Sequence, residues 1–165
     1  AKKFEKISEY LVEIFDAGNP ETSLGSVITA EDLITKGIAN IEQLREEDEI
    51  KVALSAILAE VSLKIGNLKT AQRLIDDTNL SDRGTELSTD YVRMMRVASQ
   101  IQRVQGEYDS AIYLLKKSLE FNRLTGDKLK EAEDLMALSE ILQRQSKFKE
   151  GISAADSALN IFEAL

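Results

Sequence analysis

The chain has 165 residues, a formal net charge of −8 and 43% hydrophobic residues, enough for a sizeable core in one domain. It contains no histidine and no cysteine, which excludes disulfides, Ser-His-Asp and Cys-His catalysis, and the common zinc sites. The negative charge also argues against nucleic acid or an anionic membrane as a partner. We therefore expect a protein that is not an enzyme and needs no cofactor.

The first predicted elements form a pair of helices. Residues 4–16 place apolar side chains on one stripe, which is typical of an amphipathic helix, and Pro20 cannot continue that helix. Thr29 with Asp32 predicts an N-cap and an acidic first turn for a second helix. We interpret residues 1–44 as a divergent leading hairpin, in which Ala30, Ile34 and Gly37 correspond to Ala71, Ile75 and Thr78 further along.

Three more hairpins are predicted from helical periodicity on both sides of a short turn. The turns contain Gly66, Gly106 and Ser146, so they recur every 40 residues. A fixed interval of this size indicates an array of similar units. The hairpins are expected over residues 49–78, 86–124 and 128–165.

The pattern around each turn resembles the tetratricopeptide repeat (TPR). In that family a turn glycine is followed by an aromatic and then by a small residue, as in Gly106, Tyr108 and Ala111. The Leu-Gly pair of the family is degenerate here, as in Ala98–Ser99, and the interval of 40 exceeds the family's usual 34. The resemblance implies an all-α, right-handed α-α superhelix of four antiparallel helix hairpins, forming a single TPR-like domain over residues 1–165.

Residues 7–16, the pair Asn19–Pro20 and residues 25–33 also form a recognisable pattern. It resembles the segment that joins the kinase domain to the repeats in many bacterial serine/threonine kinases. No kinase catalytic motif occurs in the chain, so kinase activity does not follow. The resemblance implies an accessory region of a bacterial signalling protein, and the sequence given is expected to be part of a longer chain. Because no apolar run approaches the length of a membrane helix, we expect a cytoplasmic location.

A row of arginines is the sharpest candidate site. Arg93, Arg96 and Arg103 share one helical face with Gln100, on a helix that the family would turn toward the concave groove. An arginine fork suits a carboxylate, so we expect an acidic peptide or a C-terminal carboxylate there. The alternative is that these arginines pair with acidic residues of neighbouring repeats, such as Glu60, Glu133 or Glu140. The predicted partner-binding residues are Arg93, Arg96, Gln100, Arg103, Glu60, Lys64, Glu140 and Gln143.

The expected function is that of a non-enzymatic interaction module that binds a peptide or a partner protein in the groove. The alternative is a regulatory sensor domain that binds a small molecule or a short signalling peptide. The first and last helices carry apolar faces, including Ile152, Leu159 and Phe162, which predict self-association or continuation of the array.

Overall fold

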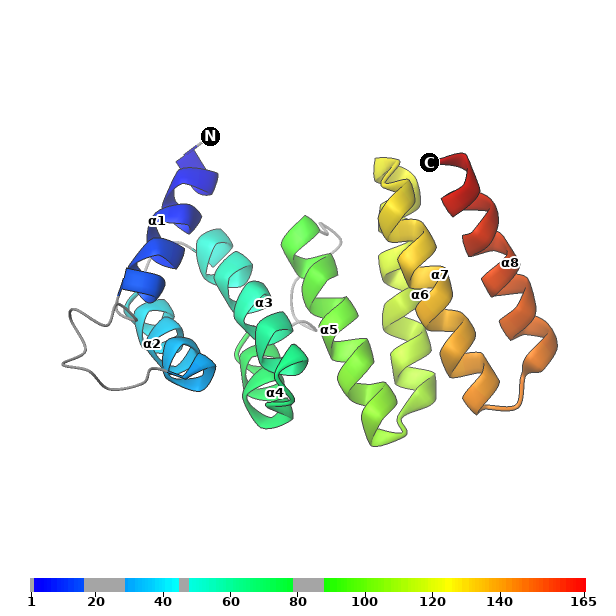
Figure 1. Cartoon of the computed structure of the whole chain (residues 1–165), viewed down its shortest axis with the longest axis horizontal. Coiled ribbons are helices and arrows are strands. Elements are labelled where there is room, and N and C mark those ends of the chain that lie inside the picture. The colour runs from blue at the N-terminus through cyan, green and yellow to red at the C-terminus, as the bar shows by residue number, and fades with distance from the viewer. Residues whose placement is uncertain (1, 17–28, 45–47, 79–87) are drawn as a thin grey trace. The chain divides into compact units, whose positions relative to one another are not determined.

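A computed structural model describes residues 2–16, 29–44, 48–78 and 88–165. In these ranges the chain forms eight α-helices and no strand, so the all-α prediction is confirmed (Figure 1). The chain divides into two compact units, residues 1–82 and 83–165, and each is described by itself. The first contains α1 (Lys2–Asp16), α2 (Ala30–Gln43), α3 (Asp48–Lys64) and α4 (Leu68–Asp76), and the second contains α5 (Thr89–Gln105), α6 (Tyr108–Thr125), α7 (Lys128–Arg144) and α8 (Phe148–Ala164).

In the first unit, α3 is the central helix because it contacts α1, α2 and α4. Its sequence suits that place, since Ala53, Leu54, Ala56 and Ala59 are almost completely buried. Gly37 lets α2 come close to its neighbours, because a Cβ atom there would lie only 2.8 Å from a methyl carbon of Leu58. Small residues thus set the spacing of these helices.

The predicted start of α2 is confirmed by a reciprocal capping box. The Thr29 side chain accepts a hydrogen bond from the Asp32 N–H, and the Asp32 carboxylate accepts one from the Thr29 N–H at 2.9 Å. The backbone bond from Thr29 is the main reason that the pKa of Asp32 lies below its usual value.

The proposed equivalence of α2 and α4 holds only in part. Ile34 and Gly37 are buried as expected, but Ala30 is exposed whereas Ala71 is fully buried. Ala30 is the first residue of α2, while Ala71 lies one turn inside α4. The leading turn around residues 25–27 lies outside the described residues.

The three corners predicted to be equivalent have the same local geometry. Gly66, Gly106 and Ser146 all have a left-handed backbone, with φ of 83°, 83° and 60°. In each corner the next N–H bonds to a carbonyl five residues back, which closes the preceding helix as a Schellman motif. These bonds are Asn67 to Ser62 (2.8 Å), Glu107 to Gln102 (2.8 Å) and Lys147 to Leu142 (2.9 Å). The interval of 40 residues is therefore a structural repeat at these corners.

In the second unit, each helix packs on the next one along the chain. One apolar cluster contains Ala111, Leu115 and Ile141, and the other contains Leu119, Ala132, Leu135 and Ala158. Gly126, with φ of 74°, closes α6 in the same way as the hairpin corners, so α7 starts at once. Within this unit, α5 packs on α6 and α7 packs on α8.

The start of α5 differs from the prediction of residue 86. Ser88 is the N-cap, and its hydroxyl accepts a hydrogen bond from the Tyr91 N–H at 3.4 Å, so the helix begins at Thr89. Residues 86 and 87 lie outside the described residues. The prediction of a single superhelical domain concerns the arrangement of both units and stays a prediction.

Candidate functional site

The first helices of the two hairpins in the second unit are joined by ion pairs between their side chains. Arg96 Nη2 lies 2.7 Å from Glu133 Oε2, and Arg103 Nη1 lies 3.7 Å from Glu140 Oε2. We call the resulting surface the α5–α7 face. It consists of Arg93, Arg96, Gln100 and Arg103 of α5 with Glu133, Met136, Glu140 and Arg144 of α7.

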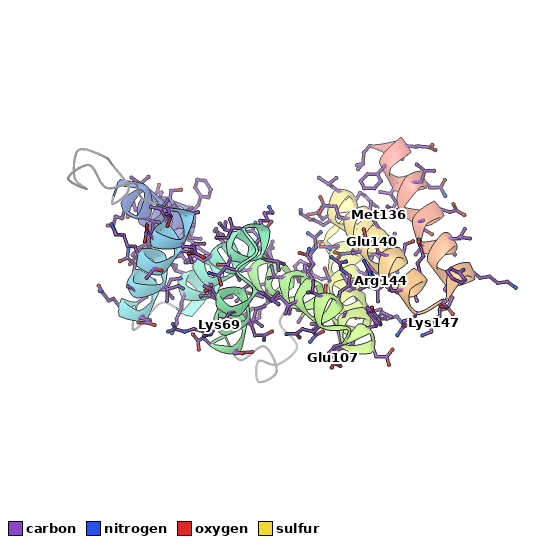
Figure 2. All side chains as sticks on the ribbon, turned by 60° about the horizontal axis from the view of Figure 1, so that its bottom comes forward. Lys69, Glu107, Met136, Glu140, Arg144 and Lys147 are labelled. Carbon is purple, nitrogen blue, oxygen red and sulfur yellow. The ribbon has the colours of Figure 1, made fainter. Side chains whose placement is uncertain are left out.

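The α7 row of this face follows from helical spacing. Met136, Glu140 and Arg144 are four residues apart, and Figure 2 shows them one after another along the helix. Met136 is 43% exposed, so the face also offers an apolar contact. Gln143, which we predicted to belong to the same site, lies beside α8 instead, because a Cβ atom at Gly151 would be 3.3 Å from Gln143 Cγ.

Arg96 is held by a buried carboxylate that the sequence analysis did not single out. Arg96 Nε lies 2.7 Å from Asp134 Oδ1, so the two form an ion pair. The Asp134 side chain is completely buried. Its other oxygen accepts hydrogen bonds from the Ser118 hydroxyl and from Asn122 Nδ2, the latter at 2.8 Å. We call these four residues the Asp134 network, which joins α5, α6 and α7.

The carboxylates around Arg96 differ in their protonation behaviour. Burial raises the pKa of Asp134 above its ordinary value, although Ser118, Arg96 and Asn122 act in the opposite direction. Burial also opposes ionisation of Glu133, but hydrogen bonds from Lys130 and Arg96 hold the pKa of Glu133 below its ordinary value. Arg96 is thus paired with Glu133, whose surroundings favour the ionised carboxylate, and with Asp134, whose burial disfavours it.

A second acidic residue fixes the α6–α7 corner. The Glu131 side chain is only 7% exposed, and it accepts hydrogen bonds from Lys128 Nζ at 2.7 Å and Arg123 Nε at 2.8 Å. The Lys128 bond, followed by the Arg123 bond, lowers the pKa of Glu131. Both partners lie away from the α5–α7 face, so the role of Glu131 is to hold the corner.

The remaining predicted residues, Glu60 and Lys64, lie on α3 in the first unit. Lys64 Nζ is 2.9 Å from Glu60 Oε1, which is a pairing within one helix. Such exposed pairs contribute little to stability. The structure pairs Arg103 with Glu140 and Arg96 with Glu133, while Arg93 and Gln100 share their side of α5 by helical spacing. Glu60 and Lys64 belong to the first unit and are described apart from them.

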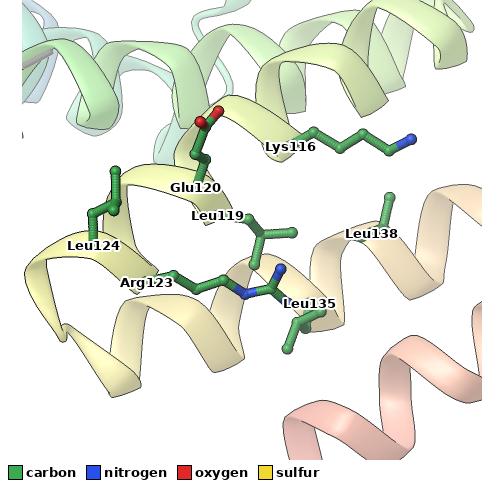
Figure 3. A pocket seen from close by; sticks show the side chains of 7 residues that line it. All are labelled: Lys116, Leu119, Glu120, Arg123, Leu124, Leu135 and Leu138. Carbon is green, nitrogen blue, oxygen red and sulfur yellow. The ribbon is translucent and has the colours of Figure 1, made fainter. Parts of the chain in front are cut away.

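A groove on the second unit was not expected from the sequence. It has a volume of about 480 Å³, is open to solvent, and is lined by α6 and α7 (Figure 3). Leu119, Leu135 and Leu138 form its apolar floor, while Lys116, Glu120 and Arg123 supply charged groups. In the sequence, the spacing of these three charged residues on one helical face was the feature that could have indicated the groove. The lining residues are Lys116, Leu119, Glu120, Arg123, Leu124, Leu135 and Leu138.

Other site types find no support in the part of the chain that the structure describes. Among the described residues, no acidic residues cluster in a way that holds a metal ion. No described helix has the combined length and apolar character that crossing a bilayer requires.

Comparison with models of known protein families gives no match, and comparison with curated proteins gives none either. The TPR resemblance therefore depends on the residue pattern and on the repeated corners. The function has to be inferred from the α5–α7 face itself.

Proposed function

We propose that the chain is a non-enzymatic, TPR-like interaction module that binds a peptide or a partner protein on the α5–α7 face. The observation that carries this proposal is the pairing of α5 and α7, the first helices of two hairpins, by ion pairs from Arg96 and Arg103. In this proposal the hairpins form a right-handed superhelix, and the first helices line its concave side.

The Asp134 network supports a preformed binding surface. Because Arg96 and the buried Asp134 link α5 to α7, the spacing of the two helices is fixed before a partner arrives. A surface that is already ordered loses less conformational entropy on binding. This gives Arg96 a positioning role rather than the anchoring role that the sequence suggested.

Arg103 is the better anchor for an acidic group. Its distance of 3.7 Å from Glu140 is long, and the Glu140 side chain is 60% exposed. Exposed pairs of this kind are weak, so a carboxylate of a bound peptide can replace Glu140 at the guanidinium. Gln100, which is exposed on the same helix face, adds an amide, and Met136 adds an adaptable apolar contact.

Selection of peptides from a random library on the whole chain tests the proposal. We expect the selected peptides to carry acidic side chains or to need a free C-terminus. Arg103→Glu should weaken their binding by about tenfold or more, since it reverses the charge opposite the peptide carboxylate. Lys116→Glu on α6 makes the same change of charge outside the face and should leave the affinity unchanged.

Circular dichroism of both variants provides the control for folding. If the selected peptides bind Arg103→Glu as tightly as the wild type, or if Lys116→Glu weakens them equally, the α5–α7 face is not the binding surface.

We further propose that the module belongs to a cytoplasmic bacterial signalling protein, on the basis of the pattern in residues 7–33. Reading the gene on both sides of this segment tests the idea. A kinase or another signalling domain in the same reading frame would support it, and a secreted or purely metabolic context would contradict it.

A second candidate function, regulatory sensing of a small molecule, is favoured by the α6–α7 groove. Its volume of about 480 Å³ lies in the range of ligand sites. A thermal-shift screen with a metabolite set distinguishes the two functions, because a small ligand that binds only the folded chain raises its melting temperature.

A further inference from the structure

The outer side of α8 carries a regular row of apolar residues. Phe148, Ile152, Ala155, Leu159 and Phe162 are spaced by alternating steps of four and three residues. Phe148, Ile152 and Leu159 are each more than half exposed, and Phe162 is 41% exposed. This spacing is typical of a helix that packs along its whole length against another helix. We call the five residues the α8 seam.

The repeat itself shows that this is a helix-docking face. The residues 40 positions earlier in α6 are Tyr108, Ile112, Leu115, Leu119 and Asn122. In α6 these positions are covered by α7: Leu115 packs with Ile141, and Leu119 packs with Ala132 and Leu135. The α8 seam is the same face, left uncovered by the described residues.

A helix that covered the α8 seam would differ chemically from α7. On α6, Ser118 and Asn122 hold the buried Asp134 carboxylate. The corresponding positions of α8 are Ala158 and Phe162, which offer no side-chain donor. A carboxylate at that place would be buried without a partner, which is strongly unfavourable. The occupant therefore presents an apolar seam of its own.

We propose that a second copy of this chain covers the seam, with the two α8 helices packed antiparallel around a two-fold axis at Ala155. The seam is self-complementary in this arrangement, because Phe148 of each copy lies opposite Phe162 of the other. The small side chain of Ala155 lets the two helices approach closely at the axis. A symmetric dimer of this kind uses the same patch on both copies.

The charges beside the seam favour the antiparallel direction. Lys149 follows Phe148, and Glu163 follows Phe162, so the two lie on the same flank at opposite ends of α8. Antiparallel packing keeps this flank of both copies on the same side of the dimer, so Lys149 of each copy meets Glu163 of the other, whereas parallel packing puts the two flanks on opposite sides and neither pair forms. Asp156 lies on the same flank beside the axis and meets its counterpart there, one repulsion against the two Lys149–Glu163 attractions.

Sedimentation equilibrium of the whole chain tests the dimer. We expect a monomer–dimer equilibrium in which Leu159→Glu raises the dissociation constant at least 30-fold, as for a residue at the centre of an interface. Leu124→Glu on α6 is the matched control, since Leu124 is 82% exposed and lies off the seam; its dissociation constant should equal that of the wild type. A wild-type chain that stays monomeric at the highest attainable concentration overturns the proposal.

Engineered cysteines test the direction, because the chain has no cysteine of its own. Under mild oxidation, Ala155→Cys should form a covalent dimer. A mixture of Phe148→Cys and Phe162→Cys should form the mixed dimer, and neither variant should cross-link to itself. Cross-linking of Phe148→Cys to itself would show parallel packing and overturn the proposed geometry.

A charge exchange adds an independent check. Lys149→Glu and Glu163→Lys should each weaken the dimer, and the double variant should restore it. Equal weakening in all three variants would contradict the pairing of these two residues.

Discussion

Ser146 occupies a backbone conformation that usually belongs to glycine. Its φ of 60° matches the left-handed geometry of Gly66 and Gly106 at the equivalent corners. A side chain in this region is strained because its Cβ approaches the following carbonyl oxygen. The interval of 40 residues predicted the equivalence although the residue type differs.

Ser146→Gly should therefore stabilise the protein by about 0.5–1 kcal/mol, the left-handed strain of about 1–2 kcal/mol less the extra chain entropy of glycine. Urea denaturation followed by circular dichroism measures the change. Gly106→Ser is the reverse substitution at an equivalent corner, and it should destabilise by a similar amount. The idea fails if both substitutions change the stability in the same direction.

The sequence predicted the arginine row and, as the alternative to a peptide anchor, its pairing with Glu133 and Glu140, which the structure shows. It did not predict the buried carboxylate of Asp134 that also holds Arg96. Asp134 follows two glutamates within four residues of α7, a pattern that reads as a solvated helix surface. Its burial depends on Ser118 and Asn122, two polar residues that lie four positions apart on one side of α6. Neither residue type signals such a partner in the sequence.

At the scale of elements, the Asp134 network joins three helices through one carboxyl group. Thr29, Gly66 and Gly106 predicted the helix ends beside them correctly, because a cap or a turn residue acts locally. α5 begins at Thr89 rather than at residue 86, because Ser88 is the N-cap. Ala30 does not correspond to Ala71, because it is the first residue of α2 and is exposed. The sequence thus predicted where helices begin and end better than it predicted which side chains of different helices are in contact.

Asp134→Asn should lower the stability at neutral pH by about 1–2 kcal/mol, since the amide loses the ion pair with Arg96. The way in which this stability difference changes with pH shows which protonation state of Asp134 the folded protein favours. Because the pKa of Asp134 is raised in the folded state, the folded protein binds this proton more tightly than the unfolded chain does. Wild type should therefore gain stability relative to the variant as the pH falls from 7 toward the ordinary carboxyl pKa.

Glu131→Gln provides the opposite case in the same helix. The pKa of Glu131 is lowered by Lys128 and Arg123, so its stabilising effect is complete above the ordinary glutamate pKa of 4.5 and is lost at lower pH. The midpoints of urea unfolding between pH 3.5 and 7 measure how the stability of each variant, Asp134→Asn and Glu131→Gln, differs from that of the wild type. A loss of the Asp134 contribution on acidification would show that the network favours the ionised carboxylate.

At the scale of the whole molecule, the second unit contains two apolar clusters that α6, α7 and α8 form among themselves. Repeat hairpins bury their apolar surface against neighbours in sequence, so stability builds up from local interfaces. This is also why the all-α fold class was predictable from periodicity, whereas the identity of a partner was not: specificity lies in side chains that no repeat signature records.

A fragment of residues 83–165 should therefore fold without the rest of the chain. We expect a helical circular dichroism spectrum and a cooperative urea transition, because the compact unit contains its own core. As a control, Leu115→Asp in the fragment should abolish the transition, since Leu115 is only 1% exposed. A fragment without a cooperative transition would show that this unit needs the first 82 residues to fold.

The difference between α6 and α8 at two corresponding positions restricts how the array can be lengthened by duplication of a hairpin. Tandem duplication of residues 128–164 would set a new aspartate against Phe162 and Ala158, where α6 has Asn122 and Ser118. The added hairpin would bury a bare carboxylate at its first junction. Lengthening this array by recombination therefore requires a compensating substitution at the same time, and the last hairpin is not an interchangeable building block.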